Sequence, residues 1–145
     1  MPERTTIERA KRDLRAGKRP STAAGEFVRE EMEHIRRGRH GARNTRQAIA
    51  IGLSKARRSG VPLQPPAPAE AKARTRKSAE RDFEAGQGRR RSSSEPRKQR
   101  TRSHARSKAS SRALEREGRT AASPRTLSAH AKQTASRRGR RSRAH

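Results

Sequence analysis

The amino-acid sequence predicts an all-α protein, in which a small N-terminal three-helix unit is followed by a largely disordered, partly helical basic tail. Three observations lead to this fold class. Apolar side chains before residue 64 recur at intervals of three and four, the period of a helix with one buried face. These apolar patterns stop at Gly17, Gly38 and Gly60. Residues 64–145 contain very few large apolar side chains, so they lack the means to build a second core.

The first helix is predicted at residues 6–16. Thr5 and Glu8 have the spacing of a capping box, in which two side chains bind free N–H groups of the first turn. Gly17 ends the helix, because glycine adopts the left-handed conformation of a helix C-terminus without steric cost. The apolar positions on one face of this helix are Ile7, Ala10 and Leu14.

The second helix is predicted to begin at the Ser21-Thr22 pair, whose hydroxyl groups suit an N-cap, and to end at Gly38. Its apolar stripe, at spacings of three and four, contains Ala24, Phe27, Val28, Met32 and Ile35.

The third helix begins after Asn44, with Gln47 in capping-box register, and ends at Gly60. Its apolar face contains Ala48, Ile49, Gly52, Leu53 and Ala56. Three short helices form a bundle near the lower size limit for independent stability, so we expect this unit to be marginal or ligand-dependent.

The chain is therefore divided into a helical domain at 1–61, a Pro-rich linker at 62–69 and a basic low-complexity tail at 70–145. Four prolines in the linker disfavour helix and favour polyproline II, which is typical of a semi-rigid spacer.

Short transient helices are expected within the tail. Residues 70–85 predict one, and Ser123 before Pro124 predicts the start of another. Residues 88–107 have no apolar period and are expected to be disordered. Helices of this length are only partly formed when they are isolated in water.

Charge is the main indication of function. The 145 residues include 40 Lys or Arg and 14 Asp or Glu, which gives a formal net charge of +26. Such a chain is suited to a polyanion: DNA, RNA or an anionic membrane surface. Helices that bind membrane surfaces place large apolar or aromatic side chains opposite their basic face, whereas this chain has no Trp or Tyr. A membrane partner is therefore not expected, and nucleic acid is favoured.

The sequence lacks the residue patterns that are typical of disulfides, metal sites and catalytic sites. Zero cysteine excludes disulfides, thiolate zinc sites and cysteine nucleophiles. His34 and His40 lie six positions apart across a predicted helix stop, which is not the spacing of a helical metal pair, so we expect ordinary exposed histidines and no metal site. With no catalytic triad or paired carboxylates in an apolar setting, we expect no enzyme activity, no cofactor and no small-molecule substrate.

Candidate phosphate contacts lie in the third helix, in the arginine-rich part of the tail and near its end. The guanidinium fork of Arg binds phosphate oxygens with two parallel hydrogen bonds. The residues are Arg46, Lys55, Arg57 and Arg58; then Arg89, Arg90, Arg91, Arg97, Lys98, Arg100 and Arg102; and finally Arg137, Arg138, Arg140 and Arg141.

A family resemblance is carried by residues 21–61, and in particular by the segment RQAIAIGLSKARRSG at residues 46–60. Together with the residues before it, it resembles a bacterial family of small basic proteins catalogued as a domain of unknown function, whose core reads close to KQAIAIGLSKARRAG. The resemblance covers about residues 1–61, and Arg46 stands where the family often has Lys. It implies a bacterial source and a DNA-binding label given to some longer members, but it supplies no catalytic or binding residues.

These observations predict a nucleoid-associated or accessory protein that binds nucleic acid through the phosphate backbone without sequence specificity, DNA being favoured over RNA. One alternative is an RNA- or ribosome-associated basic protein. Another is an adaptor whose basic tail localises it, while an acidic face of the second helix binds a protein partner through Glu26, Glu30, Glu31 and Glu33. The expected location is the cytoplasm and bacterial nucleoid, or the nucleus of a eukaryotic host.

Overall fold

A computed structural model of the chain describes residues 2–88 and 97–142, apart from the side chains of residues 97–104, 138 and 140–142. All regular secondary structure in these ranges is helical, which confirms the predicted all-α class. The helices are α1 (Arg4–Arg15), α2 (Pro20–Arg36), α3 (Thr45–Arg58), α4 (Ala73–Gly86), α5 (Arg97–Arg116), the short 3-10 helix η1 (Thr120–Ala122) and α6 (Pro124–Ser142). None of the helices in the described ranges is long and apolar enough to cross a membrane.

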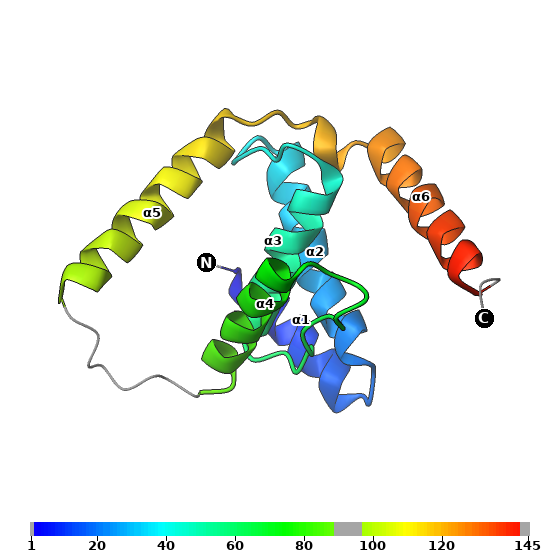
Figure 1. The fold of residues 1–145 in the computed structure, drawn as a ribbon, viewed down its shortest axis with the longest axis horizontal. Coiled ribbons are helices and arrows are strands. Elements are labelled where there is room, and N and C mark those ends of the chain that lie inside the picture. The colour runs from blue at the N-terminus through cyan, green and yellow to red at the C-terminus, as the bar shows by residue number, and fades with distance from the viewer. Residues whose placement is uncertain (1, 89–96, 143–145) are drawn as a thin grey trace.

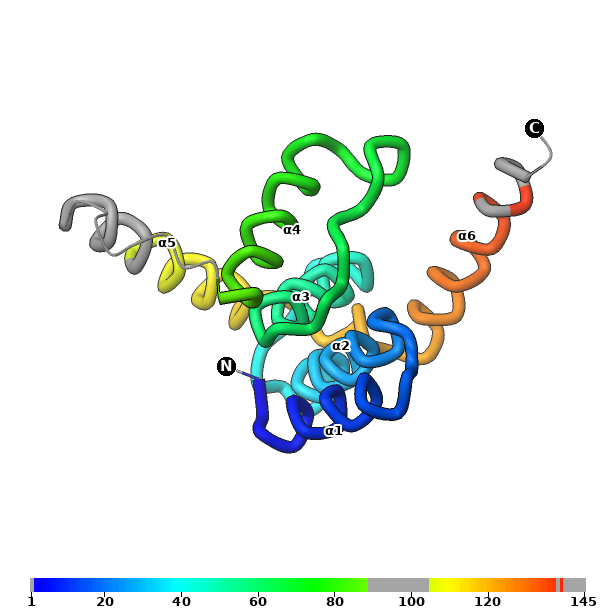
Figure 2. The backbone as a smooth tube through the Cα atoms, turned by 90° about the horizontal axis from the view of Figure 1, so that it is seen from below, coloured from blue at the N-terminus to red at the C-terminus, as the bar shows by residue number. Residues whose placement is uncertain are grey.

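The pair α2 and α3 forms the centre of the molecule (Figure 1). α1 packs on α2 and α4 packs on α3, so that Figure 2 shows the four helices side by side in the order α1, α2, α3, α4. Close approach of α2 and α3 depends on Gly52, because a Cβ atom at that position would lie 2.7 Å from the Cα of Val28.

One hydrophobic core lies where α1, α2 and the C-terminal end of α3 meet. Phe27 is its largest buried side chain, and Val61, just after α3, is also buried in it. The alanines Ala10, Ala23, Ala24 and Ala56 complete the buried cluster, and Ile7, Leu14, Leu53 and Leu63 pack against it. The apolar faces predicted for the first three helices therefore do face one another, as their helical periodicity requires.

A second core lies at the opposite end of the α2 and α3 pair. Met32, Ile35, Ala42 and Ala48 form it together with Ala121 and Ala122 of η1. Two side chains hold η1 in place: Arg36 donates to the carbonyl oxygen of Ala122 at 3.0 Å, and Thr45 donates to that of Ala121 at 2.6 Å. Part of the segment predicted as tail thus packs on the first three helices and covers apolar surface that they leave open.

Helix α4 confirms the helix predicted at residues 70–85 and packs on α3. Asp82 of α4 is buried and accepts hydrogen bonds from the Ser54 hydroxyl and the Arg58 guanidinium, both at 2.6 Å. Gly86 lies against the backbone carbonyl of Arg57 so closely that any side chain would collide with it. This polar and steric fit places α4, although its sequence offers little apolar surface.

The helix starts agree with the sequence prediction in two cases out of four. Asn44 caps α3, since its side chain accepts from the backbone N–H of Gln47 at 2.9 Å, and Ser123 accepts from the N–H of Thr126 at 3.2 Å at the start of α6. The predicted caps of the first two helices are wrong. α1 begins at Arg4, before the proposed Thr5 cap, and α2 begins at Pro20, before the Ser21-Thr22 pair.

The start of α2 at Pro20 is explained by the fixed φ of proline. Pro20 occupies the first helical position, where its missing N–H costs nothing and its φ is already helical. The predicted helix stops are correct, because Gly17, Gly38 and Gly60 all have positive φ values.

The two long helices of the C-terminal half extend away from the four-helix centre on opposite sides (Figure 1). α5 includes residues 97–107, which were predicted from the sequence to be disordered. The segment 97–107 follows Pro96 and contains neither Gly nor Pro. Most of its residues are Arg, Lys, Gln and Ala, which are good helix formers, so helix propensity accounts for the helix without an apolar face. Residues 89–96 lie outside the described part of the chain.

Candidate nucleic-acid interface

A groove of about 560 Å³ lies between the beginning of α3 and the first half of α6. Its basic lining residues are Arg43, Arg46 and His130, and none of its lining residues is acidic. The remaining walls come from Asn44, Thr45, Thr120, Ala121, Thr126, Ala129 and Gln133. The start of α3 contributes the partial positive charge of a helix N-terminus to the same space.

The two arginines of this groove are solvent-exposed and only lightly constrained. Arg46 donates to the side-chain oxygen of Gln133 on α6 at 2.7 Å, which links the two walls. Arg43 lies 3.7 Å from a carboxylate oxygen of Glu117, a pair exposed enough to contribute little to stability. Both guanidinium groups can therefore turn toward an anion in the groove at small energetic cost.

The other basic residues predicted in the third helix are engaged within the protein. Lys55 donates to Glu31 at 2.6 Å, and Arg58 donates to Asp82. Arg57 is only 8% exposed, and its guanidinium donates to the carbonyl oxygen of Leu63 at 3.1 Å, so it holds the start of the Pro-rich segment against α3. Burial lowers the pKa of Arg57, and nearby Asp82 partly offsets this effect. Of the four predicted cations in this helix, Arg46 lies at the groove.

The predicted tail cations are distributed along the C-terminal half. Arg137 is exposed on α6, the helix that forms one wall of the groove. Arg97, Lys98, Arg100 and Arg102 belong to α5 and Arg138, Arg140 and Arg141 to α6, but their side chains lie outside the described residues, as do Arg89, Arg90 and Arg91 altogether. Their role in phosphate contact stays a prediction.

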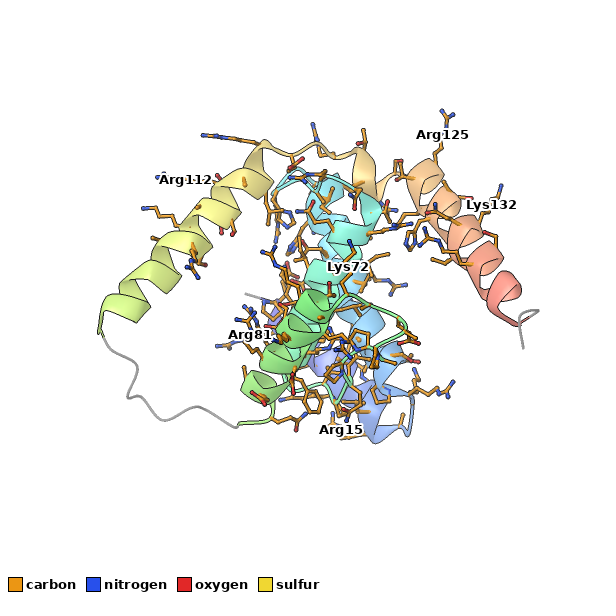
Figure 3. All side chains as sticks on the ribbon, in the orientation of Figure 1. Arg15, Lys72, Arg81, Arg112, Arg125 and Lys132 are labelled. Atoms are coloured by element: carbon orange, nitrogen blue, oxygen red, sulfur yellow. The ribbon has the colours of Figure 1, made fainter. Side chains whose placement is uncertain are left out.

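Further exposed basic side chains were not among the predicted contacts. Figure 3 labels Arg112 on α5 and Arg125 and Lys132 on α6, which project from the two long helices into solvent. Sequence spacing alone does not single them out, because the whole C-terminal half is rich in Arg and Lys.

A second polar cluster, which the sequence pattern did not predict, lies where α2 ends. The expectation of exposed histidines is wrong: His34 is 8% exposed, and the ring of His40 packs edge-on against it, with 6.0 Å between ring centroids. Gly38 turns the chain back after α2, which brings His40 beside Glu31 and His34. A signal was present in the sequence, since Glu31 and His34 are one helical turn apart.

Carboxylates and cations surround these histidines. Glu3 accepts from Arg39 at 3.0 Å and lies 3.3 Å from the Nε2 atom of His34, and these hydrogen bonds lower the pKa of Glu3, that from His34 contributing most. Glu30 accepts from the backbone N–H of Glu3. Because Glu30 and Glu31 are 6% and 0% exposed, the second helix does not present them on an open acidic face.

Comparison with protein-family models, with curated proteins and with solved structures finds no match for this chain. The family resemblance of residues 1–61 therefore stays a prediction.

Proposed function

We propose that this protein is a non-enzymatic nucleic-acid-binding protein that contacts the phosphate backbone without reading base sequence. The observation that carries the proposal is the groove between α3 and α6, which is lined by Arg43, Arg46 and His130 and by no acidic residue, on a chain with a net charge of +26. A phosphate in this groove would meet two arginines and the positive end of α3.

The distribution of acidic residues supports the same proposal. Glu30, Glu31 and Asp82 are buried among the helices, where cations and backbone groups of the same chain bind them. Exposed Arg and Lys side chains on α5 and α6 therefore face solvent beside few competing carboxylates. Affinity then comes mainly from the release of counterions condensed on the nucleic acid.

DNA is the favoured ligand, which would place the protein at the nucleoid as an accessory or nucleoid-associated protein. RNA is the alternative with the same chemistry, since arginine-rich helices bind either backbone. The adaptor alternative is weaker, because two of the four carboxylates assigned to its acidic face are buried.

The groove can be tested with two variants of equal charge. Arg43→Gln with Arg46→Gln removes both groove arginines, and Arg12→Gln with Arg15→Gln removes two exposed arginines from α1 as a control. Fluorescence anisotropy on two unrelated DNA duplexes, and on RNA duplexes of the same sequences, measures affinity across a range of salt concentrations. We expect a larger loss of affinity for the groove variant, equal on unrelated sequences, and a salt slope that is shallower by about one to two units.

Each other result has a definite meaning. A salt response that is nearly flat for the unmodified protein would refute binding through phosphate contacts. Equal losses for the two variants would show that net charge matters but that the groove is not the interface.

A further inference from the structure

In the buried cluster at the end of α2, only one of the two carboxylate oxygens of Glu31 has a hydrogen-bond partner. Glu31 is fully buried, and Lys55 binds one of its carboxylate oxygens, Oε2, at 2.6 Å. Its other oxygen, Oε1, is buried without a hydrogen-bond partner and lies 3.1 Å from Nε2 of His40. Burial of a carboxylate oxygen without a partner costs free energy, so a cation or a proton bound beside Oε1 would stabilise the folded protein.

The contacts of the His40 ring also indicate a missing cation or proton beside Glu31. Its Nδ1 atom lies 3.3 Å from the backbone carbonyl oxygen of Gly41, which can only accept. Its Nε2 atom faces the Glu31 oxygen, which also only accepts when the carboxylate is ionised. A neutral imidazole carries one N–H and cannot serve both contacts. With the proton on Nδ1, the lone pair of Nε2 and the Glu31 oxygen lie 3.1 Å apart with no proton between them.

We propose that Glu31, His34 and His40 form a binding site for a divalent transition-metal ion. One ligand atom from each of the three residues lies within 4.8 Å of the others. In a tetrahedral zinc site, with ligand bonds of about 2.0–2.1 Å, ligand atoms are about 3.3 Å apart. The contact between His40 and Glu31, at 3.1 Å, already has nearly this length. Metal binding would draw the other ligand atoms, which lie within 4.8 Å, closer together.

The surroundings resemble the outer shell of such sites. A histidine that binds a metal usually donates its other ring N–H to a carbonyl or carboxylate, as His40 would toward the Gly41 carbonyl oxygen with its proton on Nδ1. Glu3 lies 3.3 Å from the Nε2 atom of His34 and belongs to the surroundings of the site, and a water molecule would complete four ligands. Two imidazoles with one carboxylate suit zinc and related ions rather than Mg²⁺ or Ca²⁺, which prefer oxygen ligands.

The charges near the site permit a bound cation. Glu3, Glu30 and Glu31 contribute three negative charges, against one each from Lys55 and Arg39. Arg39 contacts the His34 ring at 3.1 Å, but its side chain is half exposed and can turn into solvent when a metal binds. The ion would join α2 to the loop that follows it, whose Gly41 donates to the carbonyl oxygen of Leu114 at 2.7 Å. The three proposed ligands are not among the residues that line the proposed nucleic-acid groove.

The test uses the full chain, stripped of metal with a chelator, and Zn²⁺ or Co²⁺ alone as the probe. We expect one equivalent of Zn²⁺ to bind and to raise the melting temperature, and Co²⁺ to give the visible absorption bands of a tetrahedral site. His40→Gln and His34→Gln should each weaken binding at least about tenfold, the lower end of the loss seen when even an outer-shell partner is removed. His130→Gln on α6 is the matched control and should bind as the unmodified protein does.

Circular dichroism establishes that each variant is folded before its affinity is interpreted. X-ray absorption at the zinc edge of the unmodified protein gives a second measurement that needs no variant, and we expect two imidazole ligands. Absence of binding at one equivalent, or affinity unchanged in both His34→Gln and His40→Gln, would overturn the proposal. The ring N–H of His40 would then be the partner of the Glu31 oxygen.

Discussion

Gly25 and Gly52 are both glycines inside helices, yet their surroundings differ. Gly52 of α3 lies against α2, and an added Cβ would come within 2.7 Å of the Cα of Val28. Gly25 of α2 is exposed, and an added Cβ would have no atom within 4 Å. At the scale of single residues, the packing of the two central helices therefore requires one glycine and merely tolerates the other.

Alanine substitution at the two positions should have opposite effects. Gly52→Ala should destabilise the protein by about 1–3 kcal/mol, the usual cost of overpacking, because backbone atoms of α2 must move. Gly25→Ala should stabilise it by about 0.5–1 kcal/mol, since alanine loses less entropy in a helix. Urea unfolding followed by circular dichroism measures both. Effects of the same sign would contradict the close approach of α2 and α3.

At the scale of elements, α4 shows how a basic and weakly apolar segment can pack in a defined place. Its buried residues are Ala79 and Asp82. Asp82 binds Ser54 and Arg58 from the neighbouring helix, while Gly86 permits backbone contact with Arg57. Hydrogen bonds to a charged group contribute more than neutral ones, so Asp82 is the principal polar contact of α4 with α3.

Asp82→Ala should release α4 from α3. The variant loses both hydrogen bonds of the carboxylate, and we expect a destabilisation of about 1–3 kcal/mol. Hydrogen exchange should show faster exchange of the α4 amides, with α1 and α2 less affected. Glu80→Ala removes the same charge from an exposed position of the same helix and serves as the control. Equal protection of α4 in both variants would show that Asp82 does not hold the helix.

At the scale of the whole molecule, charge is unevenly distributed along the chain. Residues 1–63 contain 16 basic and 7 acidic residues, whereas residues 64–145 contain 24 basic and 7 acidic residues. The first part contains α1, α2 and α3, and the second part, which includes α4, carries the larger net positive charge. Exposed cations on the long helices contribute little to the packing of the hydrophobic cores. Substitution of these cations should therefore change the affinity for phosphate without changing the stability of the fold.

Replacing the seven basic residues Arg89, Arg90, Arg91, Arg97, Lys98, Arg100 and Arg102 by Gln tests this division. We expect helical content and melting temperature to be nearly unchanged, while affinity falls equally on unrelated duplexes. The salt slope should become shallower by about 0.9 for each phosphate that the variant no longer neutralises. Anisotropy and circular dichroism measure the two outcomes.

The control variant replaces seven exposed basic residues of the central helices and their flanks by Gln: Arg4, Lys11, Arg12, Arg15, Lys72, Arg74 and Lys77. Full affinity of the tail variant at moderate salt would show that this part of the tail is not the principal site of phosphate binding. The groove and the basic side chains of α6 would then carry the binding.

The sequence by itself determined the helical class, the apolar faces of the first three helices, their glycine stops and the caps at Asn44 and Ser123. These features depend on residues within one or two helical turns, and such short-range relations are legible in a single chain. The net charge, which is the basis of the proposed function, is likewise a property of composition.

Only the tertiary structure decided which charged groups are free and which are enclosed. From the sequence, Arg57 is expected to be an exposed cation, but in the structure it is buried and donates to a carbonyl oxygen of the chain after Val61. His34 and His40 read as unrelated until the turn at Gly38 places both beside buried Glu31. The two alanines of η1 carry no signal of their own, yet they complete a core with Met32 and Ile35. Each of these outcomes depends on contacts between segments that are distant in sequence or reversed by a turn, which local periodicity does not encode.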